Sequence, residues 1–137
     1  MGPTGIVHVH SDYSHDGRDS LEELQAFASA RGITFVGLTE HAEDFDAARF
    51  DQYREHCGRA SADGVRLIPG LEFRFEGFPG LHLLALGLRA WIEPRTPQNF
   101  RRVGWSEGNI AAISWGTVGA ASAETWRSCF RSRMRSS

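Results

Sequence analysis

The sequence predicts an α/β fold in which short parallel strands alternate with helices. Between residues 5 and 88, short runs of β-branched and apolar residues alternate with two segments whose apolar residues recur at helical spacing. Strands that are separated by helices imply parallel pairing through right-handed crossovers. The length of 137 residues corresponds to one domain. It is too short for a complete eight-stranded α/β barrel, which takes about 250 residues.

The first strand and the first helix have clear boundaries in the sequence. Residues 5–9 form a short β-rich run, and a polar loop over 11–19 follows it. Ser20 and Glu23 have the spacing of a capping box, and Gly32 is typical of a helix end. A helix is therefore predicted between them, on the apolar stripe of Leu21, Leu24, Phe27 and Ala28.

The later elements follow the same alternation. A second helix is expected from Asp46 to about residue 60, with its apolar stripe on Phe50, Tyr53 and Cys57. A turn is expected at 76–80. The remaining runs with strand composition are 33–38, 65–68, 71–75, 81–88 and 110–118.

Composition divides the chain into two parts near residue 100. Residues 101–137 contain six arginines and two glutamates, a balance of +4, so the net charge of −2 leaves −6 on residues 1–100. We expect residues 1–100 to hold the βα units. The Arg-, Ser- and Trp-rich tail at 101–137 has two interpretations: an ordinary C-terminal cap, or a poorly ordered end that is not native coding sequence, such as a frameshift.

Several functional classes are disfavoured. No apolar run approaches the roughly 20 residues of a membrane span, and the N-terminus lacks the pattern of a secretory signal, so a cytoplasmic protein is expected. Cys57 and Cys129 lie too far apart to suggest a disulfide framework or a zinc knuckle. The acidic first hundred residues argue against a broad nucleic-acid surface. All six histidines fall in this acidic part, which suits a pocket that holds cations.

The pair His8 and His10 is the first candidate for metal binding. At a spacing of two, both imidazoles leave the same face of a strand, at the end where parallel α/β folds place their active sites. Two neutral imidazoles so placed can chelate Zn²⁺, Mn²⁺ or Fe²⁺. The alternative is that both are polar residues at a strand end.

Further residues with ligand chemistry recur near the other strand ends. His41 follows the second predicted strand, Glu72 follows the third, His82 opens a later one, and Asp16 lies in the first loop. A parallel sheet brings such ends together, so the sequence predicts one cation-holding pocket built from His8, His10, Asp16, His41, Glu72 and His82.

Other polar residues have weaker claims to a site. His15 competes with its neighbour Asp16, which we favour, and Glu40 either orients a ring nitrogen of His41 or is solvated. His56 is expected at the surface or at the edge of the core. Either Arg74 or Arg89 could meet a substrate phosphate, and the sequence does not select between them.

Four segments together resemble the first four motifs of the PHP (polymerase and histidinol phosphatase) domain family. They are HVHSDYSHDG at 8–17, LTEH at 38–41, IPGLE at 68–72 and HLLALG at 82–87, and they span about two thirds of the chain. The resemblance implies a distorted (β/α)7 barrel, up to three divalent ions (Zn, Mn or Fe) and phosphoesterase chemistry. It also implies that His8 and His10 bind one ion, that Glu72 bridges to a second ion held by His82, and that Asp16 and His41 bind a third.

The chain departs from the family pattern after its fourth motif. The family supplies three later ligands, a histidine and an Asp-x-His pair, whereas this chain has no histidine after His82 and no aspartate after Asp63. We therefore expect an incomplete barrel, whose open strand edges a second copy of the chain could cover.

Two functions from different classes remain open at this point. The first is a metal-dependent phosphoesterase that acts on a small phosphorylated substrate through metal-activated water. The second is a truncated, non-catalytic remnant or an interaction domain that completes its barrel with a partner chain. A different metal-dependent hydrolase with two histidines in its first strand, such as an amidohydrolase, also needs later ligands.

Overall fold

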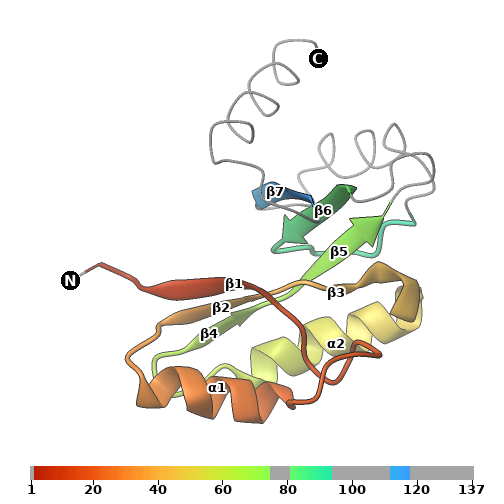
Figure 1. The fold of residues 1–137 in the computed structure, drawn as a ribbon. Helices are drawn as coiled ribbons and strands as arrows, with labels where there is room; N and C mark the ends of the chain where they lie inside the picture. Colours follow the sequence, from red (N-terminus) through yellow and green to blue (C-terminus); the bar gives the residue numbers. More distant parts are fainter. Residues whose placement is uncertain (1, 75–80, 94–111, 118–137) are drawn as a thin grey trace.

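The computed structural model describes residues 2–74, 81–93 and 112–117 (Figure 1). Within these residues the strands are β1 (Gly5–Val9), β2 (Phe35–Leu38), β3 (Glu40–His41), β4 (Arg66–Ile68), β5 (Gly70–Arg74), β6 (Leu81–Leu86) and β7 (Ala112–Thr117). The helices are α1 (Leu21–Ala30), α2 (Ala47–Ala60) and a 3₁₀ helix, η1 (Ala42–Asp44). Neither α-helix combines the length and apolar character that a bilayer crossing requires.

The described strands form two sheets. The first has the order β1-β2-β4 and is parallel throughout. The second has the order β3-β5-β6-β7, in which β3 and β5 are parallel while β6 and β7 run antiparallel to their neighbours. Both α-helices lie on the same side of the first sheet (Figure 1). The predicted α/β class with parallel strands and flanking helices is therefore confirmed for this half.

The expected parallel arrangement is wrong beyond β5. Residues 75–80 join β5 to β6, and so short a connection leaves no room for the crossover of a dozen or more residues that a parallel partner needs. The described residues form two sheets, so the (β/α)7 barrel and its open edges stay predictions. The expected turn at 76–80 and all of the tail except β7 lie outside the described residues.

Capping residues in the sequence define the ends of the two α-helices. The Ser20 hydroxyl accepts a hydrogen bond from the Glu23 N–H at 3.1 Å, as the predicted cap requires. Asp46 caps α2 in the same way, through the N–H of Arg49 at 2.8 Å. Gly32 has a φ of 70°, the left-handed conformation that favours glycine after a helix end. The structure adds β3 and η1, which the sequence analysis did not predict.

The core lies between the α-helices and the strands, and Tyr53 is one of its largest buried side chains. The Tyr53 hydroxyl donates to the carbonyl of Gly70 at 3.1 Å and accepts from the N–H of Gly70 at 3.2 Å. A Cβ on Gly70 would lie 2.3 Å from the Ala85 carbonyl oxygen and 2.5 Å from that of Leu38. Tyr53 thus links α2 to the start of β5, where the backbones approach closely.

We expect the Tyr53→Phe substitution to lower the free energy of unfolding by about 1–3 kcal/mol, because buried backbone groups of Gly70 lose a partner. Urea denaturation of the metal-free protein measures this difference. The aromatic ring stays in place, so no cavity contributes. An unchanged midpoint would show that the hydroxyl adds no net stability.

Cys57, which lies on the predicted apolar stripe of α2, is buried. Burial raises the pKa of its thiol to about 12. At pH 8 the thiolate is therefore scarce, and we expect iodoacetamide to modify Cys57 about 10²–10³-fold more slowly in the folded chain than in urea. Mass spectrometry of the peptide that contains Cys57 measures both rates. Equal rates would contradict the buried placement.

Candidate metal centre

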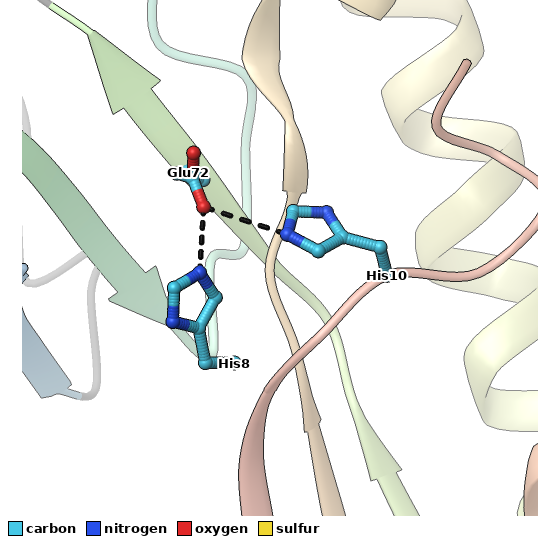
Figure 2. A group of neighbouring side chains, drawn as sticks. All are labelled: His8, His10 and Glu72. Carbon is cyan, nitrogen blue, oxygen red and sulfur yellow. Dashed lines mark hydrogen bonds and ion pairs between the residues drawn. The ribbon is translucent and has the colours of Figure 1, made fainter. Parts of the chain in front are cut away.

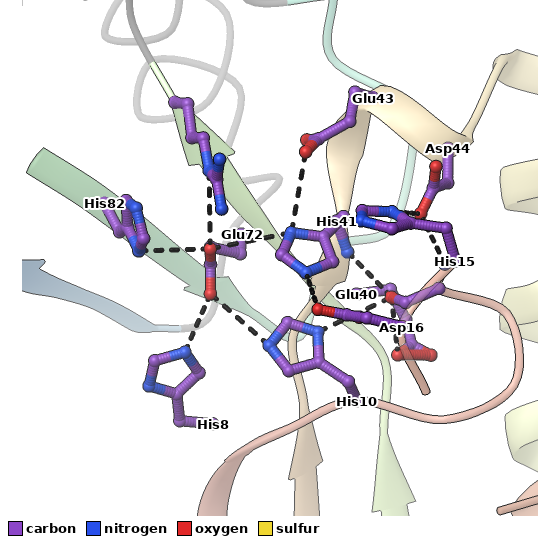
Figure 3. Close-up of polar contacts among 12 residues, drawn as sticks. His8, His10, His15, Asp16, Glu40, His41, Glu43, Asp44, Glu72 and His82 are labelled. Carbon is purple, nitrogen blue, oxygen red and sulfur yellow. Dashed lines mark hydrogen bonds and ion pairs between the residues drawn. The ribbon is translucent and has the colours of Figure 1, made fainter. Parts of the chain in front are cut away.

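Glu72 is the centre of a cluster of histidines. Its side chain is 2% exposed, and both carboxylate oxygens face imidazole nitrogens (Figures 2 and 3). Oε2 lies 2.7 Å from Nε2 of His8 and 3.4 Å from Nε2 of His10. Oε1 lies 3.1 Å from Nδ1 of His82 and 3.6 Å from Nδ1 of His41. One buried carboxylate thus connects two pairs of imidazoles.

The strand pairing explains how these side chains meet. In the parallel pair β3–β5, His41 is the partner of Glu72 and both side chains reach the same end of the sheet. Because β6 is antiparallel, its first residues lie beside the last residues of β5, and His82 is the partner of Arg74. His82, near the start of β6, therefore lies close to Glu72 in the middle of β5, which in turn pairs with His41 at the end of β3.

The backbone at His8 is irregular. Its φ is 65°, which is uncommon for a residue other than glycine, and the pairing of β1 with β2 shifts register between Val7 and Val9. The two histidines were expected on one face of a regular strand. Instead this irregularity changes the direction of the His8 side chain, and His10 lies just beyond the end of β1. Nε2 of each histidine still lies near Oε2 of Glu72. Such local strain is concentrated at functional sites.

A second group of ligand-type residues surrounds His41. Its Nε2 lies 2.9 Å from Oδ2 of Asp16, and this hydrogen bond lowers the pKa of the Asp16 carboxyl. The rings of His10 and His41 stack at 4.4 Å. Burial, followed by the charge of His41, lowers the pKa of His10, which favours the neutral imidazole. A neutral imidazole is the form that binds metals.

The chemistry of these residues fits divalent cations. The ligand atoms of His8, His10 and Glu72 lie within 4.8 Å of one another, and so do those of His10, Asp16 and His41. The Nδ1 atom of His41 is buried and has no hydrogen-bond partner among the described residues. Imidazole and carboxylate donors suit Zn²⁺, Mn²⁺ or Fe²⁺.

The structure brings all the sequence-predicted ligands into one cluster: His8, His10, Asp16, His41, Glu72 and His82 (Figure 3). His15 lies at its border, where its Nδ1 contacts Oδ2 of Asp44 at 2.8 Å and its ring lies 4.8 Å from that of His41. His56 lies elsewhere, bonded to Tyr13 and Glu22. That the clustered residues ligate an ion remains a prediction.

Glu40 has a different environment from both of those expected. It is fully buried, and its carboxylate accepts hydrogen bonds from Ser11 and Ser14. Burial raises the pKa of the Glu40 carboxyl, against the effect of these donors. The sequence analysis missed both serines; the only signal was their position inside the first motif.

The structure also distinguishes Arg74 as a neighbour of the cluster. Its Nε lies 3.9 Å from Oε1 of Glu72, while 58% of the side chain is exposed. The guanidinium is therefore both close to the histidines and open to solvent. That either Arg74 or Arg89 meets a substrate phosphate stays a prediction.

Curated relatives of the chain are bacterial DNA polymerases. Error-prone DNA polymerase of Symbiobacterium thermophilum is 35% identical over 62% of this chain and 7% of its own length. The enzyme of the same name from Mycobacterium bovis is 33% identical over 71% of this chain and 8% of its own length. DNA polymerase III subunit alpha of Treponema pallidum is 37% identical over 48% of this chain and 5% of its own length. The chain therefore spans less than a tenth of these relatives.

A solved structure and a family match complete the comparison. The structure is that of a proposed metal-dependent phosphoesterase from Bifidobacterium adolescentis. It has a TM-score of 0.44 and 25% identity over 61% of this chain and 27% of that chain, a likeness too distant to argue from. The PHP domain matches residues 7–103, which is more than half of the sequence. The chain belongs to the PHP domain family.

Proposed function

We propose that this protein is a metal-dependent phosphoesterase of the PHP type, which hydrolyses a phosphate ester with metal-activated water. The observation that carries the proposal is the buried carboxylate of Glu72 with imidazole nitrogens at both of its oxygens. Carboxylate and imidazole donors clustered around one buried oxygen pair are typical of sites that hold more than one cation.

The contacts support a division of the ligands into three sets. His8 and His10 face Oε2 of Glu72 and would hold one ion with it. His82 faces Oε1 and would hold a second ion, which makes Glu72 the bridge. Asp16 and His41 form the remaining pair and would hold a third ion.

The chemistry divides between the ions and the side chains. When bound, divalent ions supply Lewis acidity and lower the pKa of bound water to near 7. Glu72 is itself shielded from bulk water because it is buried. The exposed guanidinium of Arg74, 3.9 Å from Glu72, would pair with phosphate oxygens. Ser11 and Ser14 donate their hydroxyl hydrogens to Glu40, so we assign neither as a nucleophile.

Because the late ligands are missing, the non-catalytic alternative is tested in the same experiment. Fewer protein ligands leave coordination positions for water and substrate, which hydrolysis needs, but they also weaken affinity for the ions. The relatives are named as DNA polymerases, which act on nucleic acid. The phosphodiester bond of nucleic acid is therefore a second candidate substrate class. Substrates of both classes therefore belong in the assay.

The test measures hydrolysis by the full chain supplied with Mn²⁺ or Zn²⁺. An aryl phosphate monoester, a bis-aryl phosphodiester and a short DNA serve as substrates. We expect one class to be hydrolysed. His10→Ala should reduce the rate by about 10²-fold or more, because loss of a metal ligand weakens the several kcal/mol by which a bound ion stabilises charge in the transition state. His56→Ala is the matched control and should retain the rate, because His56 contacts Tyr13 and Glu22 rather than the cluster.

Two outcomes would overturn the proposal. Absence of hydrolysis with all three substrates, together with ion binding far below one per chain, would favour the non-catalytic remnant. A solution mass of a dimer or larger assembly, again without hydrolysis, would favour an interaction domain that completes its fold with another chain.

A further inference from the structure

Ser14 joins two of the candidate ligands to the buried carboxylate of Glu40. It lies in the loop between β1 and α1 and is itself buried. Its hydroxyl donates to Oε1 of Glu40 at 3.1 Å and accepts from the N–H of His41 at 2.9 Å. The same oxygen lies 3.5 Å from Nδ1 of His10. One side chain therefore contacts His10, Glu40 and His41.

The hydrogen-bonding capacity of a hydroxyl restricts what Ser14 can offer His10. A serine hydroxyl has one hydrogen to donate and two lone pairs to accept with. The hydrogen points to Glu40, and one lone pair accepts the N–H of His41. Only a lone pair is left for His10, so Nδ1 of His10 must carry the hydrogen in this contact.

Glu40 secures the direction of the Ser14 hydrogen. It is 0% exposed, and a buried carboxylate is stable only when donors surround it. The N–H of Ser11 donates to Oε1 at 2.6 Å, the Ser11 hydroxyl donates to Oε2, and Ser14 provides a further donor at Oε1. If Ser14 turned its hydrogen toward His10, Glu40 would lose that donor without replacement.

The other ring nitrogen of His10 then has a free electron pair. Nε2 lies 3.4 Å from Oε2 of Glu72, and neither atom has a hydrogen to donate when His10 is neutral. These two acceptors repel each other, so the contacts at Nδ1 rather than this one set the tautomer, and a cation near both atoms would replace the repulsion with attraction.

We propose that Ser14, oriented by Glu40, is a positioning residue that holds His10 in the tautomer protonated at Nδ1 and directs its free Nε2 electron pair toward Glu72. The role of this electron pair as a metal ligand rests on the proposed function. The tautomer itself does not, and it can be observed without any ion.

The tautomer is measured by NMR on the metal-free, ¹⁵N-labelled full chain at pH 8, where the His10 imidazole is neutral. Long-range ¹H–¹⁵N correlations distinguish a protonated from an unprotonated ring nitrogen, and His10→Gln assigns the signals. We expect the wild type to be protonated at Nδ1. Ser14→Ala should lose this preference, and Ser14→Thr, which restores a hydroxyl, should recover it. Protonation at Nε2 in the wild type overturns the proposal, and this measurement needs no variant of Ser14.

Zn²⁺ affinity, measured by competition with a chelator, provides the second readout. We expect Ser14→Ala to weaken binding about 10–100-fold, as loss of a group that orients a ligating histidine does, and Ser14→Thr to restore it. Ser20→Ala is the matched control, because Ser20 bonds the N–H of Glu23 at the start of α1, and it should leave affinity unchanged. Unchanged affinity in Ser14→Ala would overturn the positioning role.

The two proposals can fail separately. A wild-type chain that has the expected tautomer but binds no Zn²⁺ contradicts the proposed function and supports the assignment of Ser14. A chain that binds Zn²⁺ tightly with His10 protonated at Nε2 when metal-free supports the proposed function and overturns the assignment of Ser14.

Discussion

The Glu72→Gln variant is expected to lose two bound ions per chain and to show no measurable phosphoesterase activity. Glutamine has nearly the same size as glutamate, so packing around this 2% exposed side chain is preserved. The substitution removes the negative charge and replaces one acceptor oxygen with an NH₂ donor. That donor would point at imidazole nitrogens that lie 2.7–3.6 Å from the Glu72 oxygens. The ion held by His8 and His10 and the ion held by His82 would then no longer share a carboxylate.

Metal analysis after dialysis and Zn²⁺ titration measure this loss. Removing a shared carboxylate eliminates several kcal/mol of attraction for each ion, so affinity should fall by at least about 10²-fold. Glu55→Gln is the matched control, since Glu55 is exposed on α2 and should bind ions as the wild type does. Circular dichroism of the metal-free variant checks that it folds. Wild-type ion content in Glu72→Gln would exclude Glu72 as the bridge.

Short-range sequence signals predicted the elements that depend on few neighbours. The N-cap at Ser20 involves a partner three residues away, and that at Asp46 does the same. The end of α1 at Gly32 depends only on the left-handed φ of that residue, which glycine adopts readily. Because these interactions are local, composition and spacing were sufficient to place α1 and α2.

The convergence of ligands was also predictable, for a different reason. Parallel strands deliver their ends to one edge of a sheet, so residues at such ends meet whatever the details of packing. His41 at the end of β3 meets Glu72 as its direct partner in β5, although Glu72 lies in the middle of that strand rather than at its end. His82 meets them although β6 is antiparallel, because it lies at the start of that strand.

Features that depend on long-range packing escaped the sequence analysis. The bulge at His8 breaks the regular spacing on which the pairing of His8 with His10 was predicted. The contact between Ser14 and Glu40 joins residues 26 positions apart and requires the first loop to fold onto β3. No periodicity in the sequence reports such an approach.

Gly17 limits how that first loop can fold. The loop is tight: the N–H of Ser14 bonds the carbonyl of Ser11 at 3.1 Å, and the N–H of Gly17 bonds the carbonyl of Ser14 at 3.1 Å. A Cβ at position 17 would lie 1.8 Å from the Ser11 carbonyl oxygen and 2.5 Å from its carbonyl carbon. Both are backbone atoms, which cannot turn away as a flexible side chain would. Any side chain at position 17 must therefore open the loop.

Gly17→Ala is expected to reduce the free energy of unfolding by about 1–3 kcal/mol, as overpacking of a tight site does. Asp16 directly precedes Gly17, and its carboxylate lies 2.9 Å from Nε2 of His41. Opening the loop therefore also moves this carboxylate away from His41. Urea denaturation measures the first effect, and Zn²⁺ titration should show weaker binding for the second.

Gly58→Ala provides the matched control because a Cβ there meets no atom within 4 Å. Gly58 is exposed in α2, where alanine should raise stability by about 0.5–1 kcal/mol and leave Zn²⁺ binding unchanged. The two glycine variants thus change the same group with opposite expected signs. If Gly17→Ala matched Gly58→Ala in both measurements, the loop would not need glycine, and its close approach to Ser11 would not support the placement of Asp16.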